Sequence, residues 1–219
     1  VFFFFQSRRR HTRFTSDWSS AFSSSVLSFV ELSTKHHTNS IYLTNWMYHY
    51  VECKTPGIPD ELFDRDENVP ITKEEVRVVQ ISKARLKPGM IVYDIGCGSG
   101  SISVEAAHQV EESGHVHAVD YDAKAVELTK KNLEKFNLAN VSVILGNAKE
   151  KISELPNADA VFIGGTGTDT NEIMHICQDK LKSGGRIVIG MILIETIFSV
   201  LSSIKELDFD SVEIGRASC

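Results

Sequence analysis

A buried strand that runs into a glycine-rich turn is the feature of this chain that most constrains its fold. The run Ile91-Val-Tyr-Asp-Ile-Gly-Cys-Gly-Ser-Gly-Ser-Ile102 predicts a strand, a tight turn and the start of a helix. Farther along, Val116–Asp120 predicts a second strand that ends on a carboxylate. Glycine lets a backbone turn sharply and lie against a ligand, and a carboxylate so placed can accept hydrogen bonds from ribose hydroxyls. The pattern indicates a nucleoside pocket in a doubly wound α/β fold.

The spacing of the glycines distinguishes between two kinds of nucleotide site. Dinucleotide-binding proteins carry G-x-G-x-x-G, whereas the sixth position here is Ser101, which disfavours an NAD-dependent oxidoreductase. From Asp94 the spacing is D-x-G-x-G-x-G, which resembles the first motif of class I S-adenosylmethionine-dependent methyltransferases. A tight turn without a ligand is the structural alternative. The flanking strand and helix, together with Asp120, favour the cofactor site.

Composition excludes several other classes of protein. The chain has 219 residues, a hydrophobic fraction of 42% and a net charge of -6, which suit one globular domain rather than a nucleic-acid-binding protein. Its four cysteines lack disulfide or zinc spacing, and no apolar run approaches the roughly 20 residues that span a bilayer. We expect a cytoplasmic protein with no membrane segment, no nucleic-acid partner and no metal site.

The two ends of the chain differ from its middle. The opening phenylalanines precede an arginine- and serine-rich stretch, which is the reverse of the order in a signal peptide. That stretch and the last few residues resemble translated sequencing-adapter sequence. We therefore expect residues 1–46 and 215–219 to be non-native or disordered, Met47 to lie close to the true start, and one domain to cover residues 47–214.

Helices and strands alternate along that domain. Besides the two strands above, strands are predicted over 141–145, 158–163, 186–193 and 211–214. Besides the helix that follows the glycine-rich turn, helices are predicted over 123–136, 149–155, 171–181 and 195–207. A further helix is predicted to begin at a capping box of Thr72 and Glu75 and to end before Pro88. Such alternation implies a mostly parallel sheet with helices on both faces and ligands at the carboxyl ends of the strands.

The predicted sheet has fewer strands than is usual for a class I methyltransferase. A class I methyltransferase sheet normally has a seventh, antiparallel strand inserted beside the fifth, and here the chain ends just after the sixth strand, 211–214. We expect the C-terminal strands to be truncated. The fifth strand, 186–193, would then present an unpaired apolar edge, and the fold would be less stable than its complete relatives.

Several segments around the glycine motif are similar to the CbiT family, the decarboxylating precorrin or cobalt-precorrin C15-methyltransferases of cobalamin biosynthesis. They are Thr55–Phe63, Val69–Arg77, Asp94–Gly100, Val161–Gly165, and Gly184–Ile189 leading into Ile192–Thr196. The glycine motif is common to the superfamily, and the other segments are more particular. The resemblance covers residues 54–214 and implies S-adenosylmethionine as cofactor, a tetrapyrrole substrate and a homotetramer.

The same resemblance implies which residues hold the cofactor. Position by position they are Thr72, Gly96, Cys97, Gly98, Ser99, Gly100, Asp120 and Ala148. The glycine backbone would approach the methionine part, Asp120 would hold the ribose hydroxyls, and Ala148 would lie beside adenine. Thr72 has a sufficient role as a helix cap. Asp94 is expected to brace the loop, or to hold the methionine amino group through water, rather than to act in chemistry.

The implied reaction is methyl transfer to a ring carbon, with loss of carbon dioxide from an acetate side chain of the tetrapyrrole. Because the sulfonium is already activated, positioning and exclusion of water can supply most of the catalysis, and no catalytic residue is assigned. Gly165 and Thr166 after the fourth strand and Glu195 after the fifth are candidate substrate residues. A turn residue and a helix-start carboxylate are the structural alternatives for Thr166 and Glu195.

Cations are needed to attract a substrate that carries many carboxylates. Lys73, Arg77 and Lys83 could supply them, although a solvated helix face is the simpler interpretation. Two other functions stay open: a class I methyltransferase that acts on RNA or protein, and a truncated, inactive product that binds cofactor only. An N6-adenine enzyme would usually carry an Asn/Asp-Pro-Pro-aromatic motif where this chain has Gly164-Gly-Thr-Gly167.

Overall fold

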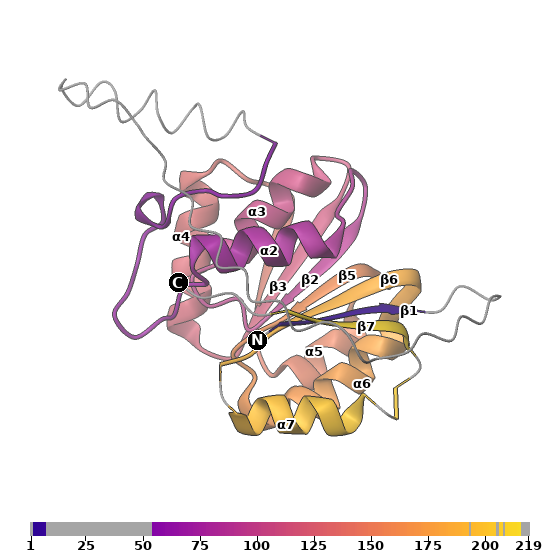
Figure 1. Cartoon of the computed structure of the whole chain (residues 1–219). Helices are drawn as coiled ribbons and strands as arrows, with labels where there is room; N and C mark the ends of the chain where they lie inside the picture. The colour runs from indigo at the N-terminus through magenta and orange to yellow at the C-terminus, as the bar shows by residue number, and fades with distance from the viewer. Residues whose placement is uncertain (1, 8–53, 193, 205, 208, 216–219) are drawn as a thin grey trace, which may run out of the picture.

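The sheet is the frame on which every predicted site residue is placed. The computed structural model describes residues 2–7, 54–192, 194–204, 206–207 and 209–215. Within this part, seven strands pair in the order β4-β3-β2-β5-β6-β1-β7 (Figure 1). The strands are β1 (Phe2–Ser7), β2 (Ile91–Ile95), β3 (His115–Asp120), β4 (Val141–Leu145), β5 (Ala158–Ile163), β6 (Leu181–Gly190) and β7 (Phe209–Gly215). The pairs that join β4, β3, β2, β5 and β6 are parallel, whereas β1 is antiparallel to both neighbours.

Helices cover both faces of this sheet, as Figure 1 shows. One face carries α2 (Glu74–Ala84), α3 (Ser101–Val110) and α4 (Ala123–Lys135), and the other carries α5 (Ala148–Glu154), α6 (Thr170–Lys180) and α7 (Ile194–Ser203). Short 3-10 turns, η1 (Asp60–Leu62) and η2 (Gly167–Asp169), precede α2 and α6. The predicted doubly wound α/β class is confirmed.

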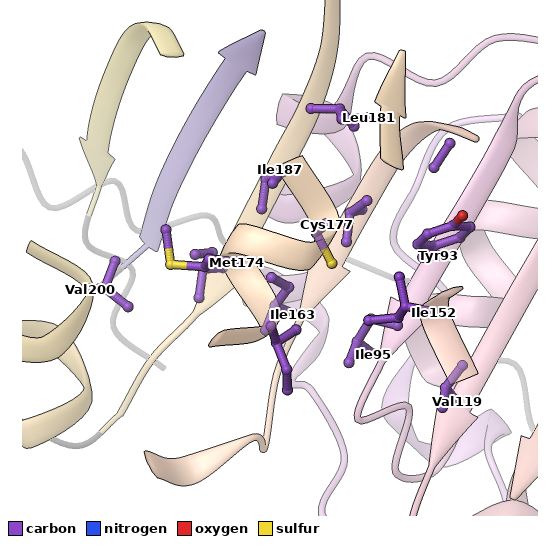
Figure 2. Packing of buried hydrophobic residues seen from close by; sticks show 14 of the residues in the cluster. Tyr93, Ile95, Val119, Ile152, Ile163, Met174, Cys177, Leu181, Ile187 and Val200 are labelled. Carbon is purple, nitrogen blue, oxygen red and sulfur yellow. The ribbon is translucent and has the colours of Figure 1, made fainter. Parts of the chain in front are cut away.

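Two apolar cores lie between the sheet and its helices. In the first, Ile152, Cys177 and Val200 of α5, α6 and α7 meet the buried side chains of β2, β5 and β6 (Figure 2). In the second, the residues of α2 and α3 pack on the opposite face, around Val92 and Phe162. Both faces of the central strands are therefore buried under helices. This explains why the sequences of these strands are continuous apolar runs and do not alternate between apolar and polar residues.

The predicted boundaries hold to within a few residues, except around β6. The sequence predicts a strand over 186–193, whereas β6 runs over Leu181–Gly190 with an irregular register opposite β5. The helix predicted over 195–207 is α7 and ends at Ser203. Glu195 lies in its first turn, where the helix dipole favours a carboxylate.

The prediction that the fifth strand of the parallel sheet has an unpaired edge was wrong. That strand is β6, and β1 pairs with it antiparallel, with Phe3 opposite Ile189 and Phe5 opposite Ile187. β1 also pairs with β7 on its other side. The position expected to be empty is filled by a strand from the opposite end of the chain. Strand pairing depends on backbone hydrogen bonds that any extended segment can supply, so connectivity along the sequence does not decide it.

The capping box predicted at Thr72 and Glu75 is also absent. α2 begins at Glu74, its N-cap is Lys73, and no side chain caps it. Thr72 instead offers its carbonyl oxygen to the guanidinium of Arg77. The expected domain limits, 1–46, 47–214 and 215–219, stay a prediction, because residues 8–53 and 216–219 lie outside the described part. In the described residues, no helix is long and apolar enough to cross a membrane.

Candidate functional site

The glycine loop (Gly96–Gly100) connects β2 to α3 at the carboxyl edge of the sheet. Gly96 and Gly98 have φ values of +76° and +55°, a region that favours glycine. A Cβ on Gly96 would lie 1.8 Å from the carbonyl oxygen of Gly164, and one on Gly98 would lie 2.8 Å from that of Pro70. These two glycines are therefore required by contacts within the protein, which bring three segments together at one point.

Buried polar side chains of α4 fix the other side of the glycine loop. The Thr129 hydroxyl donates to the Gly98 carbonyl at 2.9 Å, and the Asn132 amide donates to the Ser99 carbonyl at 2.8 Å. Asn132 also exchanges hydrogen bonds with the backbone of Asp64, in the segment before α2. Sequence reasoning missed both residues. The available signal was two polar residues within an otherwise apolar helix face, and buried polar groups require such partners.

Asp120 ends β3 and faces the glycine loop. One carboxylate oxygen accepts from the Gly98 N–H at 2.9 Å and the other accepts from the Asp122 N–H at 3.0 Å. Each carboxylate oxygen can accept more than one hydrogen bond, so Asp120 retains acceptor capacity toward the adjoining cavity. It both holds the loop and can bind hydroxyls, as predicted for the second strand of a nucleoside site.

Asp94 lies behind the loop and is buried. Its carboxylate accepts a hydrogen bond from the Ser103 hydroxyl of α3. Burial raises the pKa of Asp94 to about 7, although the Ser103 bond opposes this and the nearby Asp120 charge adds to it. Asp94 therefore joins β2 to α3 at the root of the loop, which agrees with a bracing role.

A cavity of about 340 Å³ opens in front of Asp120, and we call it the β3 cavity. Its lining residues are Ile95, Gly96, Val119, Asp120, Tyr121, Gly146, Asn147, Ala148, Gly165, Thr166, Asp169 and Ile173. They lie at the carboxyl ends of the parallel strands and in the segments that follow them, where ligands bind in open α/β sheets. Lys149 of α5 pairs with Asp169 and Glu172, at 3.5 and 2.9 Å, and so ties two walls of the cavity together. Tyr121, which sequence reasoning missed, is an exposed aromatic side chain at the rim.

The predicted cofactor residues divide into two groups. Gly96, Asp120 and Ala148 line the β3 cavity. The other predicted residues do not line it; they are Thr72, Cys97, Gly98, Ser99 and Gly100. Cys97 is buried beneath the loop beside Thr129, and burial raises the pKa of its thiol. Cys97, Gly98, Ser99 and Gly100 are thus part of the loop itself, whereas the carbonyl of Thr72 accepts from Arg77.

A second, smaller cavity of about 180 Å³ lies beside the first, and we call it the β6 cavity. Its lining residues are Gly165, Thr166, Gly167, Thr170, Ile189, Gly190, Met191, Ile192 and Thr196. Gly165 and Thr166 line both cavities, so the predicted substrate residues form the wall between them. Glu195 is exposed and lines neither cavity.

The hydroxyl of Thr166 has a defined role in hydrogen bonding. Thr170 donates its only hydroxyl proton to the Gly167 carbonyl at 2.8 Å. In the 2.8 Å contact between the Thr166 and Thr170 hydroxyls, Thr166 must therefore be the donor. Thr166 consequently presents oxygen lone pairs, and no proton, to the shared wall.

Arg77 does not belong to a cationic surface, contrary to one of the sequence interpretations. Its guanidinium is fully buried and pairs with Glu105 at 2.6 Å and with Asp60 at 3.1 Å. Glu105 also accepts from the backbone N–H groups of Gly57 and Ile58. This network fixes the segment before α2 against α3. Lys73 pairs with Asp60 at 3.2 Å, so two of the three suggested cations serve the same segment.

A larger cavity lies away from this site. It measures about 920 Å³, is open to solvent, and lies near the start of β3, where His108, His115 and Phe136 are among its lining residues. None of the predicted site residues lines it. Size alone would select this cavity, but the glycine loop and Asp120 are at the opposite edge of the sheet. We therefore assign the candidate site to the β3 and β6 cavities.

Comparison with known proteins agrees with this geometry. A family model described as "Precorrin methyltransferase domain" matches residues 61–215. The chain is 49% identical over 164 residues to a probable cobalt-precorrin-6B C(15)-methyltransferase (decarboxylating) of Sulfurisphaera tokodaii, covering 74% of this chain and 85% of that one. It is 46% identical over 161 residues to a protein of the same description from Saccharolobus solfataricus, covering 73% and 81%.

Solved structures give the same result. The structure described as precorrin 8W decarboxylase from Methanobacterium thermoautotrophicum superposes with a TM-score of 0.66 at 35% identity, covering 70% of this chain and 82% of that one. Precorrin-6y C5,15-methyltransferase from Geobacter metallireducens superposes with a TM-score of 0.65 at 34% identity, covering 69% and 80%. The glycine loop, the carboxylate at the end of β3 and these matches together place the chain in the precorrin methyltransferase family.

Proposed function

We propose that this chain is an S-adenosylmethionine-dependent methyltransferase that methylates C15 of cobalt-precorrin-6B or precorrin and removes the carboxylate of the C12 acetate side chain. The observation that carries the proposal is the pair of adjoining cavities at the carboxyl edge of β2–β6, in a chain of the precorrin methyltransferase family. The β3 cavity is suited to a cofactor, and the smaller β6 cavity, of about 180 Å³, is suited to one part of the acceptor. Their shared wall is where a methyl group would pass.

The β3 cavity suits S-adenosylmethionine. Asp120 would accept hydrogen bonds from the ribose hydroxyls, since both of its oxygens keep lone pairs after bonding to the loop. Ala148 and the exposed Tyr121 would flank adenine, and the backbone at Gly96 would lie beside the methionine part. Cys97, Gly98, Ser99 and Gly100 would contribute by shaping the loop.

Thr166 would serve the transferred methyl group. Its hydroxyl presents lone pairs to the wall between the cavities, and a sulfonium and its methyl group are electropositive. Oxygen acceptors at this point would orient the S–CH3 bond toward the acceptor carbon. In-line positioning of two reactants can supply a large part of a rate enhancement.

The deciding experiment supplies the chain with cobalt-precorrin-6B and S-adenosylmethionine and follows the product by mass spectrometry. The expected product has gained one methyl group and lost carbon dioxide. Methylation with retention of carbon dioxide would show that the decarboxylating part of the proposal is wrong. Methylation of RNA or protein, with no reaction of the tetrapyrrole, would favour the alternative class of methyltransferase.

A cofactor-binding test separates an enzyme from an inactive product. Isothermal titration should detect S-adenosylmethionine binding to the wild-type chain and a large loss of affinity in Asp120→Ala. Asp122→Ser is the matched control, because Asp122 caps α4 two residues away and serine preserves such a cap. Equal affinity in Asp120→Ala and the control would contradict the assignment of the ribose site.

A further inference from the structure

The β6 cavity differs from the β3 cavity in the chemistry of its walls. Its described lining residues are glycines, threonines and apolar side chains, none of which carries a charge. The β3 cavity includes the carboxylates of Asp120 and Asp169. The two cavities share Gly165 and Thr166, so a group bound in one lies beside a group bound in the other.

The loop between β5 and α6 leaves room for a ligand at this place. A Cβ added to Gly164, Gly165 or Gly167 would meet no atom within 4 Å. The situation is the reverse at Gly96 and Gly98, where an added Cβ would collide with the protein itself. The glycines after β5 therefore border open space that a side chain would otherwise occupy.

The backbone of the same loop is suited to an anion. Thr166 has right-handed helical angles, φ −89° and ψ −3°, and Gly167 follows with a left-handed φ of +54°. Successive residues in these two conformations direct their N–H groups to one side and form an anion-binding concavity. Across the cavity, the half-buried Thr196 of α7 adds a hydroxyl donor. All of these donors are neutral.

We propose that the β6 cavity binds the acetate carboxylate of the tetrapyrrole, the group that leaves as carbon dioxide. This assignment rests on the proposed function and adds to it a specific subsite. The bond between the acetate methylene and its carboxylate breaks, and its electron pair enters the conjugated ring. The ring carbon forms the new bond to the methyl group, while the S–CH3 pair stays on sulfur. A proton displaced from the ring replaces the carboxylate on the methylene.

The absence of charge among the described lining residues has a physical reason under this assignment. A lysine or arginine would hold the carboxylate with charge-assisted hydrogen bonds, which are lost when neutral carbon dioxide forms. The backbone N–H groups of the loop and the Thr196 hydroxyl are neutral donors, which orient the same group and oppose its departure less.

Ile192 gives a direct test, because it lines the cavity and is 95% exposed, so its replacement should not disturb folding. Ile192→Lys would place an ammonium at the subsite, and Ile192→Met is the uncharged control. With cobalt-precorrin-6B carrying a labelled acetate carboxylate, Ile192→Lys should show a lower KM. Its release of labelled carbon dioxide at saturation should be roughly tenfold slower than in the control. The affinity for S-adenosylmethionine should be the same in both.

Thr196→Lys and Thr196→Met repeat the comparison from the α7 wall and should change KM and carbon dioxide release in the same direction. Equal KM values and equal release from the lysine and methionine variants at both positions would overturn the subsite. A wild-type chain that transfers no methyl group to the tetrapyrrole would instead overturn the proposed function, and the subsite with it.

Discussion

Thr166 stands on the wall that both cavities share, and its oxygen is the side-chain acceptor that we assign to the methyl group. Thr166→Val keeps the shape of the side chain and removes that oxygen. We expect kcat to fall roughly tenfold, because an acceptor near a charged group contributes on the order of 1.5 kcal/mol, while the affinity for S-adenosylmethionine changes little. Steady-state kinetics with titration of the cofactor checks this. Thr166→Ser should retain most of the activity, and equal losses in the serine and valine variants would contradict the assigned role.

Asp94 makes the stability of the chain depend on pH. Burial raises the pKa of Asp94 to about 7, so the folded chain binds this proton more tightly than the unfolded chain, where the pKa is about 4. The resulting stabilisation is complete below about pH 4 and is lost as the pH rises to about 7, up to roughly 4 kcal/mol in total. Asp94→Asn should therefore flatten the pH dependence of the unfolding free energy across this window. Denaturant unfolding of the wild-type chain and of Asp94→Asn from pH 4 to pH 8 measures this dependence. The prediction would be refuted if the unfolding free energies of the two proteins changed with pH in the same way.

At the scale of elements, the buried pair of Arg77 and Glu105 joins α2 to α3 and holds the segment before α2. Arg77→Met would leave the Glu105 carboxylate buried without its cation. We expect the free energy of unfolding to fall by about 3 kcal/mol or more. The control is Lys73→Met, which removes the more exposed pair with Asp60 and should cost less than about 1 kcal/mol. Chemical unfolding measures both values. Similar losses of unfolding free energy in Arg77→Met and Lys73→Met would show that the buried pair contributes no more to stability than the exposed one.

Strand β1 supplies the second pairing partner of β6, and its contribution can be measured by one substitution. Phe4 lies opposite Val188 of β6 and Glu213 of β7. Phe4→Pro removes a backbone donor from a strand that is paired on both sides, so the melting temperature should fall and the exposed edge of β6 should promote association. Phe4→Val, which is compatible with a strand, is the control. Thermal melts and light scattering that do not distinguish the two variants would argue against this pairing.

The whole molecule should respond to S-adenosylmethionine, the cofactor that we propose, as one folding unit. S-adenosylmethionine at a hundred times its Kd should stabilise the folded state by about 2.7 kcal/mol. For a domain of this size that corresponds to a rise in the melting temperature of roughly 5 °C or more. NAD is the control, because Ser101 replaces the third glycine of the dinucleotide pattern. A rise with NAD and none with S-adenosylmethionine would reverse the assignment of the cofactor.

Within residues 72–214, the sequence by itself determined the order of the helices and strands and the place of the site. Short continuous apolar runs bounded by turn residues fit strands that are covered on both faces, and a glycine-rich turn after such a strand lies at the carboxyl edge of the sheet. Gly96, Asp120, Ala148 and Thr166 were predicted there, and all four line the β3 cavity. These inferences need only local pattern, because each strand carries its own burial signal.

Tertiary structure decided which distant groups meet. The pairing of β1 with β6, the burial of Arg77 against Glu105, and the hold of Asn132 on the glycine loop each join segments far apart in the chain. A charged or polar side chain has the same local pattern whether it faces water or a buried partner, and a strand edge accepts any suitable backbone. Only the folded arrangement specifies which groups become partners. The free energy of these contacts depends on burial, and a segment is buried only when the rest of the chain packs against it.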